Sequence, residues 1–297
     1  MTNKTPTISI NLDAEKDIEL FCRFLESEKY PQKRAAILYF YKGLAKKIEQ
    51  GREEKEAVRD ILSDLYSRYD PKLKEIVGRA GMDFSGAGPV FDALSQYMEF
   101  PQLGEQTYSA TPTLLPFSPL GNMRFFFSVA PVVANREIPP LHIAAIGIHE
   151  ISHFIFFKQL EDWSKATGNS LNDAAIHYFK EALTPAVMNQ KEFLDFFDYA
   201  KVFPGSSSLG KYRGNKEVQS LMVENGGVVK NIVDLFEEEI VCAPEGYLVG
   251  LNKMLGLFAD SNEELAGKWN LWNKTKAKQE KNDAGMEDYK KPILMHR

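Results

Sequence analysis

The feature that most constrains this chain is the HExxH pattern His149-Glu150-Ile151-Ser152-His153. On a helix, residues four apart lie on the same face, so both imidazole rings can reach one metal ion. Glu150 then lies beside that ion without having to bind it, where it can take a proton from a water molecule. The spacing therefore predicts a helix that holds Zn²⁺, because neutral imidazole suits this ion.

The residues around this pattern are almost uncharged. Between Leu141 and Phe157, Glu150 is the only Asp, Glu, Lys or Arg. Such a helix is expected to be buried nearly all round, and a buried carboxylate with two imidazoles needs partners. A metal ion can supply them. The alternative is that the histidines are core residues bonded to backbone carbonyls and that Glu150 pairs with a distant Lys or Arg.

A catalytic zinc site needs a third protein ligand and an open position for water. Glu161 and Asp162 are the nearest carboxylates in the sequence. However, Glu161 would lie about 12 Å along the helix from His153, which is too far for the same ion. We therefore expect these two residues to be solvated at the end of the helix.

A second helix offers a better third ligand. Residues 164–169 look like a turn, and Ser170 with Asp173 resembles a capping box that opens a helix from Leu171 to about Asn189. The first helix runs about 15 Å beyond His153, and the second returns about 16 Å from its cap to Glu181. An antiparallel pair would thus bring Glu181 level with His153.

The residues around Glu181 carry a resemblance to a known family. HExxH on one helix, with Tyr178-Phe179-Lys180-Glu181-Ala182-Leu183-Thr184 on the next, resembles the gluzincin branch of zinc metallopeptidases over roughly residues 120–200. The resemblance implies a zincin-like fold, with His149, His153 and Glu181 as zinc ligands and Glu150 as general base. It also implies that the strand at 123–130 belongs to a sheet whose edge binds peptide. Pro185 departs from the pattern, because some relatives carry an acidic residue there that orients the zinc histidines.

Three further residues are candidates for the chemistry. His177, one turn before Glu181, could replace it as ligand, hydrogen-bond to it, polarise a substrate carbonyl or stay at the helix surface. Tyr212 lies in a glycine-flanked loop and is a candidate for stabilising a tetrahedral oxyanion, as is Tyr247. Either tyrosine could equally be structural. Cys242 is a weaker candidate for a zinc thiolate.

The wider sequence predicts a predominantly helical α+β protein. Helical spacing recurs from Asp13 to about Arg79, with a short strand at Ile8–Ile10. Gly, Pro and Ser between residues 81 and 119 predict loop or irregular strand, and residues 216–238 and 247–259 are expected to be helical. We expect an N-terminal helical region at 1–100, a zincin-like metallopeptidase domain at 101–273, and a charged, disordered tail at 274–297.

Composition restricts the partners and the cellular compartment that we expect for the protein. The net charge of −5 argues against nucleic acid as the main partner, and the two cysteines, Cys22 and Cys242, require no disulfide framework. The N-terminal residues lack the apolar core of a secretory signal, and no segment is long and apolar enough to span a membrane. We expect a cytoplasmic protein.

The leading hypothesis is zinc-dependent peptide-bond hydrolysis, with a peptide or protein as substrate. A zinc hydrolase acting on a non-peptide amide is a variant of it. The alternative is a non-catalytic interaction protein, or a degenerate metallopeptidase that retains the HExxH helix.

Overall fold

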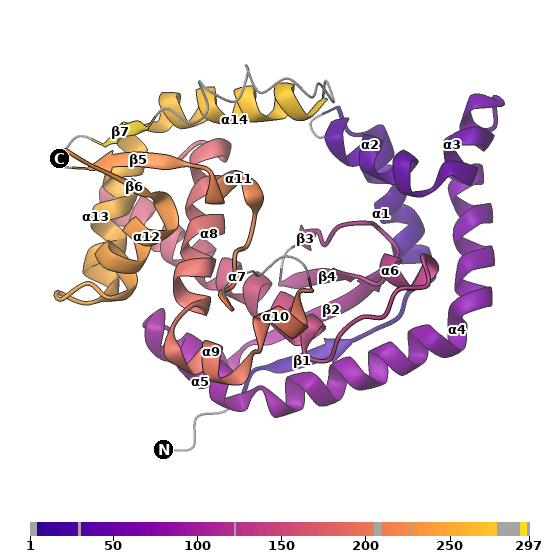
Figure 1. Cartoon of the computed structure of the whole chain (residues 1–297), viewed down its shortest axis with the longest axis horizontal. Helices are drawn as coiled ribbons and strands as arrows, with labels where there is room; N and C mark the ends of the chain where they lie inside the picture. Colours follow the sequence, from indigo (N-terminus) through magenta and orange to yellow (C-terminus); the bar gives the residue numbers. More distant parts are fainter. Residues whose placement is uncertain are drawn as a thin grey trace. The chain divides into compact units, whose positions relative to one another are not determined.

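The computed structural model describes residues 5–28, 31–121, 123–204, 210–225, 227–277 and 292–295. It is predominantly helical with two small sheets, which confirms the predicted α+β class (Figure 1). The chain forms two compact units. The sheet unit comprises Pro6–Gly88 and Glu105–Gly147, and the site unit contains Pro89–Gly104 and Ile148–Arg297. The predicted domain boundaries stay predictions, and most of the predicted tail at 274–297 lies outside the described residues.

Helices dominate the first part of the sheet unit, as the spacing of apolar residues predicts. In the first of them Ile18, Phe21 and Leu25 are buried, and the Asp13 side chain caps its N-terminus by accepting a hydrogen bond from the Lys16 amide at 2.9 Å. The helices are α1 (Ala14–Glu26), α2 (Pro31–Phe40), α3 (Lys42–Glu49) and α4 (Glu54–Gly86).

A mixed four-stranded sheet completes the sheet unit. Its order is β1-β2-β4-β3, with β1, β2 and β4 parallel and β3 antiparallel to β4. Phe125 and Phe127 of β4 are fully buried, in agreement with the strand predicted from this aromatic run. The short helix α6 (Ala130–Val133) then leads to the helix that carries HExxH. The strands are β1 (Thr7–Ile10), β2 (Thr107–Thr113), β3 (Leu120–Gly121) and β4 (Arg124–Ser128).

A buried carboxylate joins these elements. Asp17 of α1 has no exposed surface and accepts hydrogen bonds from the Tyr66 hydroxyl at 2.9 Å and the Leu114 amide at 2.8 Å. The Thr113 hydroxyl at the end of β2 donates a third. Burial outweighs these hydrogen bonds and raises the pKa of Asp17 from 3.8 to about 6. Asp17 therefore ties α1 to α4 and to the sheet.

The loop predicted from residue 81 onward is partly wrong. Helix α4 continues to Gly86, and α5 (Gly88–Tyr97) follows almost at once. Phe84, Phe91 and Leu94 are buried in this stretch. Burial of these side chains outweighs the weak helix propensity of the glycines and serines around them.

The site unit is built around two long helices, α7 (His142–Thr167), which starts in the sheet unit, and α8 (Asp173–Met188). No helix in the described part of the chain is long and apolar enough to cross a membrane. The other elements of the site unit are the helices α9 (Lys191–Phe196), α10 (Tyr199–Val202), α11 (Lys216–Gln219), α12 (Ile232–Phe236), α13 (Tyr247–Asp260) and α14 (Asn262–Ala277), the strands β5 (Met222–Asn225), β6 (Val228–Asn231) and β7 (Ile293–Met295), a 3-10 turn at Pro101–Glu105 and a π-helical turn at Glu237–Val241.

An aromatic cluster fixes α8 within the site unit. The Phe179 ring stacks on Phe156 of α7, with ring centroids 5.0 Å apart and an interplanar angle of 13°. On its other sides Phe179 contacts Phe236 of α12 at 4.6 Å and Phe258 of α13 at 4.8 Å. All four rings are fully buried. The residue that lies two positions before Glu181 is thus anchored on three neighbouring helices.

The helix predicted over residues 216–238 is partly wrong, because only its two ends are helical, as α11, α12 and the π-helical turn. Strands β5 and β6 form an antiparallel hairpin in this segment, and β7 pairs with β5 in parallel. The turn signal is Asn225-Gly226-Gly227, a sequence typical of tight hairpin turns. Gly227 has a φ of 79°, the left-handed conformation that glycine adopts at no steric cost. The predicted helix at 247–259 is confirmed as α13.

Candidate metal site

Two consecutive helices of the site unit carry the predicted ligands. His149 and His153 lie one turn apart on α7, and Glu181 lies on α8. The residue that caps α8 is Asn172 rather than the predicted Ser170, since the Asn172 side chain accepts a hydrogen bond from the Ala175 amide at 2.9 Å. This shift of the helix start leaves Glu181 level with the histidines.

The geometry of the three side chains fits a shared cation. Oε2 of Glu181 lies 3.6 Å from Nε2 of His149, and Oε1 lies 3.5 Å from Nε2 of His153. One ligand atom from each residue lies within 4.8 Å of the other two. Two atoms that share a tetrahedral zinc ion at about 2.1 Å lie roughly 3.4 Å apart. The group can therefore hold a metal ion.

The protonation states also suit a cation. Burial, with a smaller effect from Lys180, lowers the pKa of His153 well below 6.5, so its imidazole is neutral near pH 7. Burial alone would raise the pKa of Glu181, but the Lys180 ammonium and the contacts with His149 hold it well below 4.5. A neutral imidazole and an ionised carboxylate are the forms that bind metal.

Lys180 supplies a positive charge to the same group. Its ammonium hydrogen-bonds Oε1 of Glu181 and lies 3.4 Å from Nε2 of His153. It therefore contacts two of the three candidate ligand atoms and balances the buried carboxylate. Sequence reasoning assigned no role to Lys180. Its position directly before Glu181 was the available signal, but side-chain direction decides whether such a neighbour turns inward.

Tyr212 reaches the site from a loop far along the chain. Its hydroxyl lies 2.8 Å from Nδ1 of His149, the ring nitrogen that does not face Glu181. Burial raises the pKa of Tyr212 well above 10, with smaller contributions from nearby carboxylates that include Glu181 and Glu150. The hydroxyl therefore stays protonated near neutral pH, and its contact with His149 can fix the orientation of that ring.

The backbone on either side of Tyr212 is held in place. The Tyr212 amide donates to Oδ1 of Asn189 at 2.8 Å, and the Asn189 side chain donates to the Tyr212 carbonyl at 2.9 Å. Asn189 directly follows α8. The loop that carries Tyr212 is thus fastened to the end of the helix that carries Glu181.

A pair of hydroxyls links the two ligand helices. Ser152 Oγ of α7 lies 2.6 Å from Thr184 Oγ1 of α8 and donates to the His149 carbonyl at 2.7 Å. With the Ser152 proton on the His149 carbonyl, the Thr184 hydroxyl donates to Ser152 Oγ, and the Lys180 carbonyl 3.1 Å away is its alternative acceptor. Ser152 is the second x of the HExxH pattern, directly before His153, and Thr184 lies three residues after Glu181. These bonds fix the relative position of the helices next to the candidate ligands.

His177 lies in a different environment from the one its spacing suggested. Its Nε2 lies 3.5 Å from a carboxylate oxygen of the buried Glu217, and its ring packs edge-on against Trp269 with centroids 4.1 Å apart. It is not part of the His149, His153 and Glu181 group. His177 is still an electrostatic neighbour of His153 and a minor cause of the lowered pKa of His153. Its predicted catalytic role stays a prediction.

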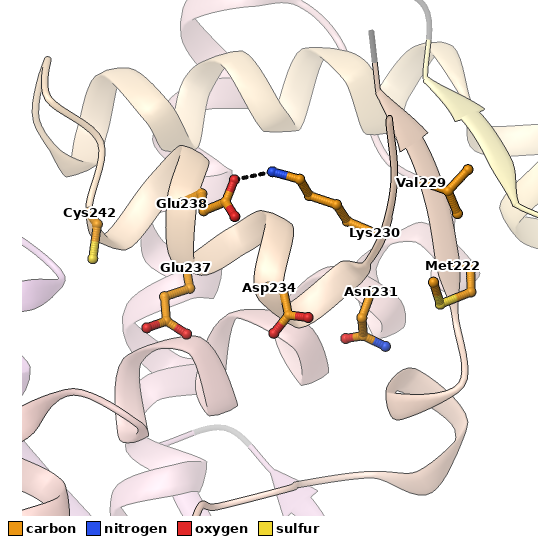
Figure 2. Close-up of a pocket in the computed structure, with 8 residues that line it drawn as sticks. All are labelled: Met222, Val229, Lys230, Asn231, Asp234, Glu237, Glu238 and Cys242. Atoms are coloured by element: carbon orange, nitrogen blue, oxygen red, sulfur yellow. Dashed lines mark hydrogen bonds and ion pairs between the residues drawn. The ribbon is translucent and has the colours of Figure 1, made fainter. Parts of the chain in front are cut away.

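The other candidates are engaged elsewhere. The Tyr247 hydroxyl donates to Gln159 at 2.9 Å, and Glu161 pairs with Lys158 and Lys165 at the protein surface, as expected. Cys242 lies in a cavity of about 650 Å³ beside the π-helical turn, where Glu238 pairs with Lys230 (Figure 2). Cys242 does not belong to the group that could hold a metal.

Comparison with known proteins gives no significant match to any protein-family model, curated protein or solved structure. The function is therefore argued from the residues and geometry of the site.

Proposed function

We propose that this chain is a zinc-dependent hydrolase of peptide bonds in which His149, His153 and Glu181 hold the ion. The observation that carries the proposal is the pair of 3.6 and 3.5 Å separations between the imidazole nitrogens and the Glu181 oxygens. They match the spacing of atoms around one tetrahedral ion. Two imidazoles and one carboxylate are also a recurrent ligand set of catalytic zinc.

When bound, Zn²⁺ would polarise the substrate carbonyl and lower the pKa of a water molecule. Glu150 is the proposed general base. It follows His149 on α7, is only 8% exposed, and lies close enough to Tyr212 to contribute to its raised pKa. Its carboxylate would take the proton of the attacking water and transfer it to the leaving amine.

Tyr212 is proposed to act on His149. If Nε2 of His149 faces the ion, the ring proton is on Nδ1, and the Tyr212 oxygen 2.8 Å away accepts it. This contact supplies an orienting partner although Pro185 stands where some gluzincins carry an acidic residue. The role of oxyanion donor predicted for Tyr212 requires its hydroxyl to leave His149, so we favour the orienting role.

The choice of peptide as substrate rests on the resemblance of the HExxH helix and residues 178–184 to gluzincins. The burial of the group is consistent with hydrolysis, because removal from water strengthens the electrostatic interactions of Glu150 and Glu181 with their surroundings.

One observation favours a second candidate function. The Lys180 ammonium contacts Glu181 and His153 directly, so the buried charge is balanced without a metal. A metal-free interaction protein that retains the HExxH helix would need such an internal cation. The two candidates differ in metal content, which can be measured.

The deciding experiment is elemental analysis of the purified wild type, Glu181→Ala and Glu192→Ala. Glu192 is the matched control, because it is an exposed carboxylate bound to Tyr97. We expect about one zinc per chain in the wild type and in Glu192→Ala, and a sharp loss in Glu181→Ala. Zinc retained in Glu181→Ala would show that another residue is the third ligand, and His177 would be the next residue to test. No metal after zinc has been offered would favour the interaction protein.

A second variant separates catalysis from metal binding. Glu150→Gln keeps the shape of the side chain and removes the base. We expect it to bind zinc as tightly as the wild type does. Its rate of cleavage of a peptide library should be at least about 100-fold lower. Equal cleavage by both proteins would contradict the proposed role of Glu150.

A further inference from the structure

The sheet unit contains a cavity of about 380 Å³ that is unrelated to the HExxH residues. Its lining residues come from α1, β2, β3 and β4 and from the turn between β3 and β4. Its lining residues are Lys16, Glu19, Leu20, Arg23, Ser109, Gly121, Met123, Arg124 and Phe126.

The register of the sheet explains one wall. Ser109 of β2 is paired with Arg124 of β4, so their side chains share a face of the sheet. Phe126 lies two residues further along β4 on that face and is 4% exposed. This wall therefore offers a hydroxyl, a guanidinium and an aromatic floor.

The opposite wall comes from one face of α1. Lys16, Leu20 and Arg23 follow the spacing of a single helical stripe, and Glu19 lies next to it. Leu20 is buried and continues the apolar floor, whereas Lys16 and Arg23 extend beyond it. The two walls thus place three cationic side chains around one cavity.

Within the part of the chain that the structure describes, these three cations have no ion-pair partner. Lys16, Arg23 and Arg124 form no ion pair with any carboxylate among the described residues, and Glu19 is the one acidic side chain of the lining. Elsewhere in the sheet unit many cations are paired, for example Arg34 with Glu54 and Arg68 with Asp64. Unbalanced positive charge in a chain of net charge −5 is relieved when an anion binds.

We propose that this cavity is a binding site for a small organic anion with a phosphate or carboxylate group. The Arg124 and Arg23 guanidinium groups bind the oxyanion, because their planar forks match the oxygens of either group. Lys16 adds charge and the Ser109 hydroxyl a further hydrogen bond. Leu20 and Phe126 contact an apolar part of the ligand. The site is independent of the proposed metal centre.

The test is calorimetric titration of the full chain at low ionic strength with three probes: inorganic phosphate, phenyl phosphate and benzoate. We expect phenyl phosphate or benzoate to bind more tightly than phosphate, since each adds a ring for the apolar floor. Phenyl phosphate as the best probe identifies a phosphorylated ligand, and benzoate as the best probe identifies a carboxylate.

Two variants locate the binding. Arg124→Gln and Arg23→Gln should each lower the affinity of the chain for the best probe by about tenfold or more. Arg23 is exposed on α1, so its replacement tests the site even if Arg124→Gln disturbs the sheet. Arg68→Gln is the control, because Arg68 is an exposed arginine of the same unit paired with Asp64. No binding of any probe, or an equal loss in Arg68→Gln, would overturn the proposal.

Discussion

The Tyr212 hydroxyl lies 2.8 Å from Nδ1 of His149, although 63 residues separate the two in the sequence. The contact leaves Nε2 of His149 directed to Glu181, so it selects the nitrogen that faces the candidate metal position. Because Asn189 fastens the Tyr212 backbone to the end of α8, the histidine and the carboxylate are oriented by one connected structure.

Replacement of Tyr212 by phenylalanine should weaken zinc binding by about 10- to 100-fold, because the variant removes the hydrogen-bond partner of a metal-binding histidine. Affinity is measured by competition with a chromogenic chelator. Tyr247→Phe is the control, since Tyr247 is also a buried tyrosine of the site unit but bonds to Gln159. Equal affinities of Tyr212→Phe and the wild type would contradict the orienting role.

Replacement of Lys180 by methionine should have two opposite effects. The loss of the ammonium leaves the Glu181 carboxylate without its nearest cation, so the metal-free protein should be destabilised by about 1–3 kcal/mol. Zinc affinity should rise by about tenfold, because a divalent ion is no longer repelled by the ammonium.

Thermal unfolding without metal and chelator competition measure the two effects of the Lys180 change. Lys165→Met is the control, since Lys165 is an exposed lysine of α7 that pairs with Glu161. Weaker zinc binding by Lys180→Met would show that the ammonium supports the metal site rather than competing with it.

The pH dependence of stability should reveal the buried Asp17. Its folded-state pKa is about 6 against 3.8 for the free group, so the folded protein binds this proton more tightly than the unfolded chain does. The stability that protonation confers is present below pH 4 and is lost as the pH rises through 6. The loss amounts to about 3 kcal/mol.

Asp17→Asn isolates this effect, because the amide imitates the protonated carboxyl in shape and cannot ionise. The free energy of unfolding is measured for both proteins by denaturant titration between pH 4 and pH 7. We expect the wild type to lose about 2 kcal/mol relative to the variant over this range, since part of the loss has already occurred at pH 4. Parallel curves would contradict the raised pKa.

Gly147, two residues before His149, should not tolerate alanine. A Cβ atom there would lie 2.5 Å from the Phe84 ring, which packs against this position from α4. We expect Gly147→Ala to cost about 1–3 kcal/mol, although alanine normally favours a helix. In the control Gly78→Ala the new methyl meets nothing within 4 Å, so α4 should gain about 0.5–1 kcal/mol. Chemical denaturation gives both values, and a stabilised Gly147→Ala would refute the close contact.

Some errors of sequence-based prediction have a common physical cause. Residues 81–97 contain weak helix formers but are helical, because Phe84, Phe91 and Leu94 are buried. The helix expected over 216–238 is broken by the β5–β6 hairpin. The sequence Asn225-Gly226-Gly227 is typical of such a turn, but the apolar residues on either side of it are also compatible with a helix. In both segments tertiary contacts decide between local conformations of similar energy.

The sequence by itself determined the parts of the site that depend on helix geometry. The four-residue spacing places His149 and His153 on one face, and two helices joined by a short turn bring Glu181 level with them. The positions of Tyr212, Lys180 and His177 were decided only by the tertiary structure. Tyr212 contacts a histidine on a distant helix, and no local sequence pattern relates the two. Packing around α8 decides that Lys180 turns toward His153 and that His177 pairs with Glu217 instead. Local periodicity is encoded over a few residues, whereas such contacts depend on how the whole unit packs.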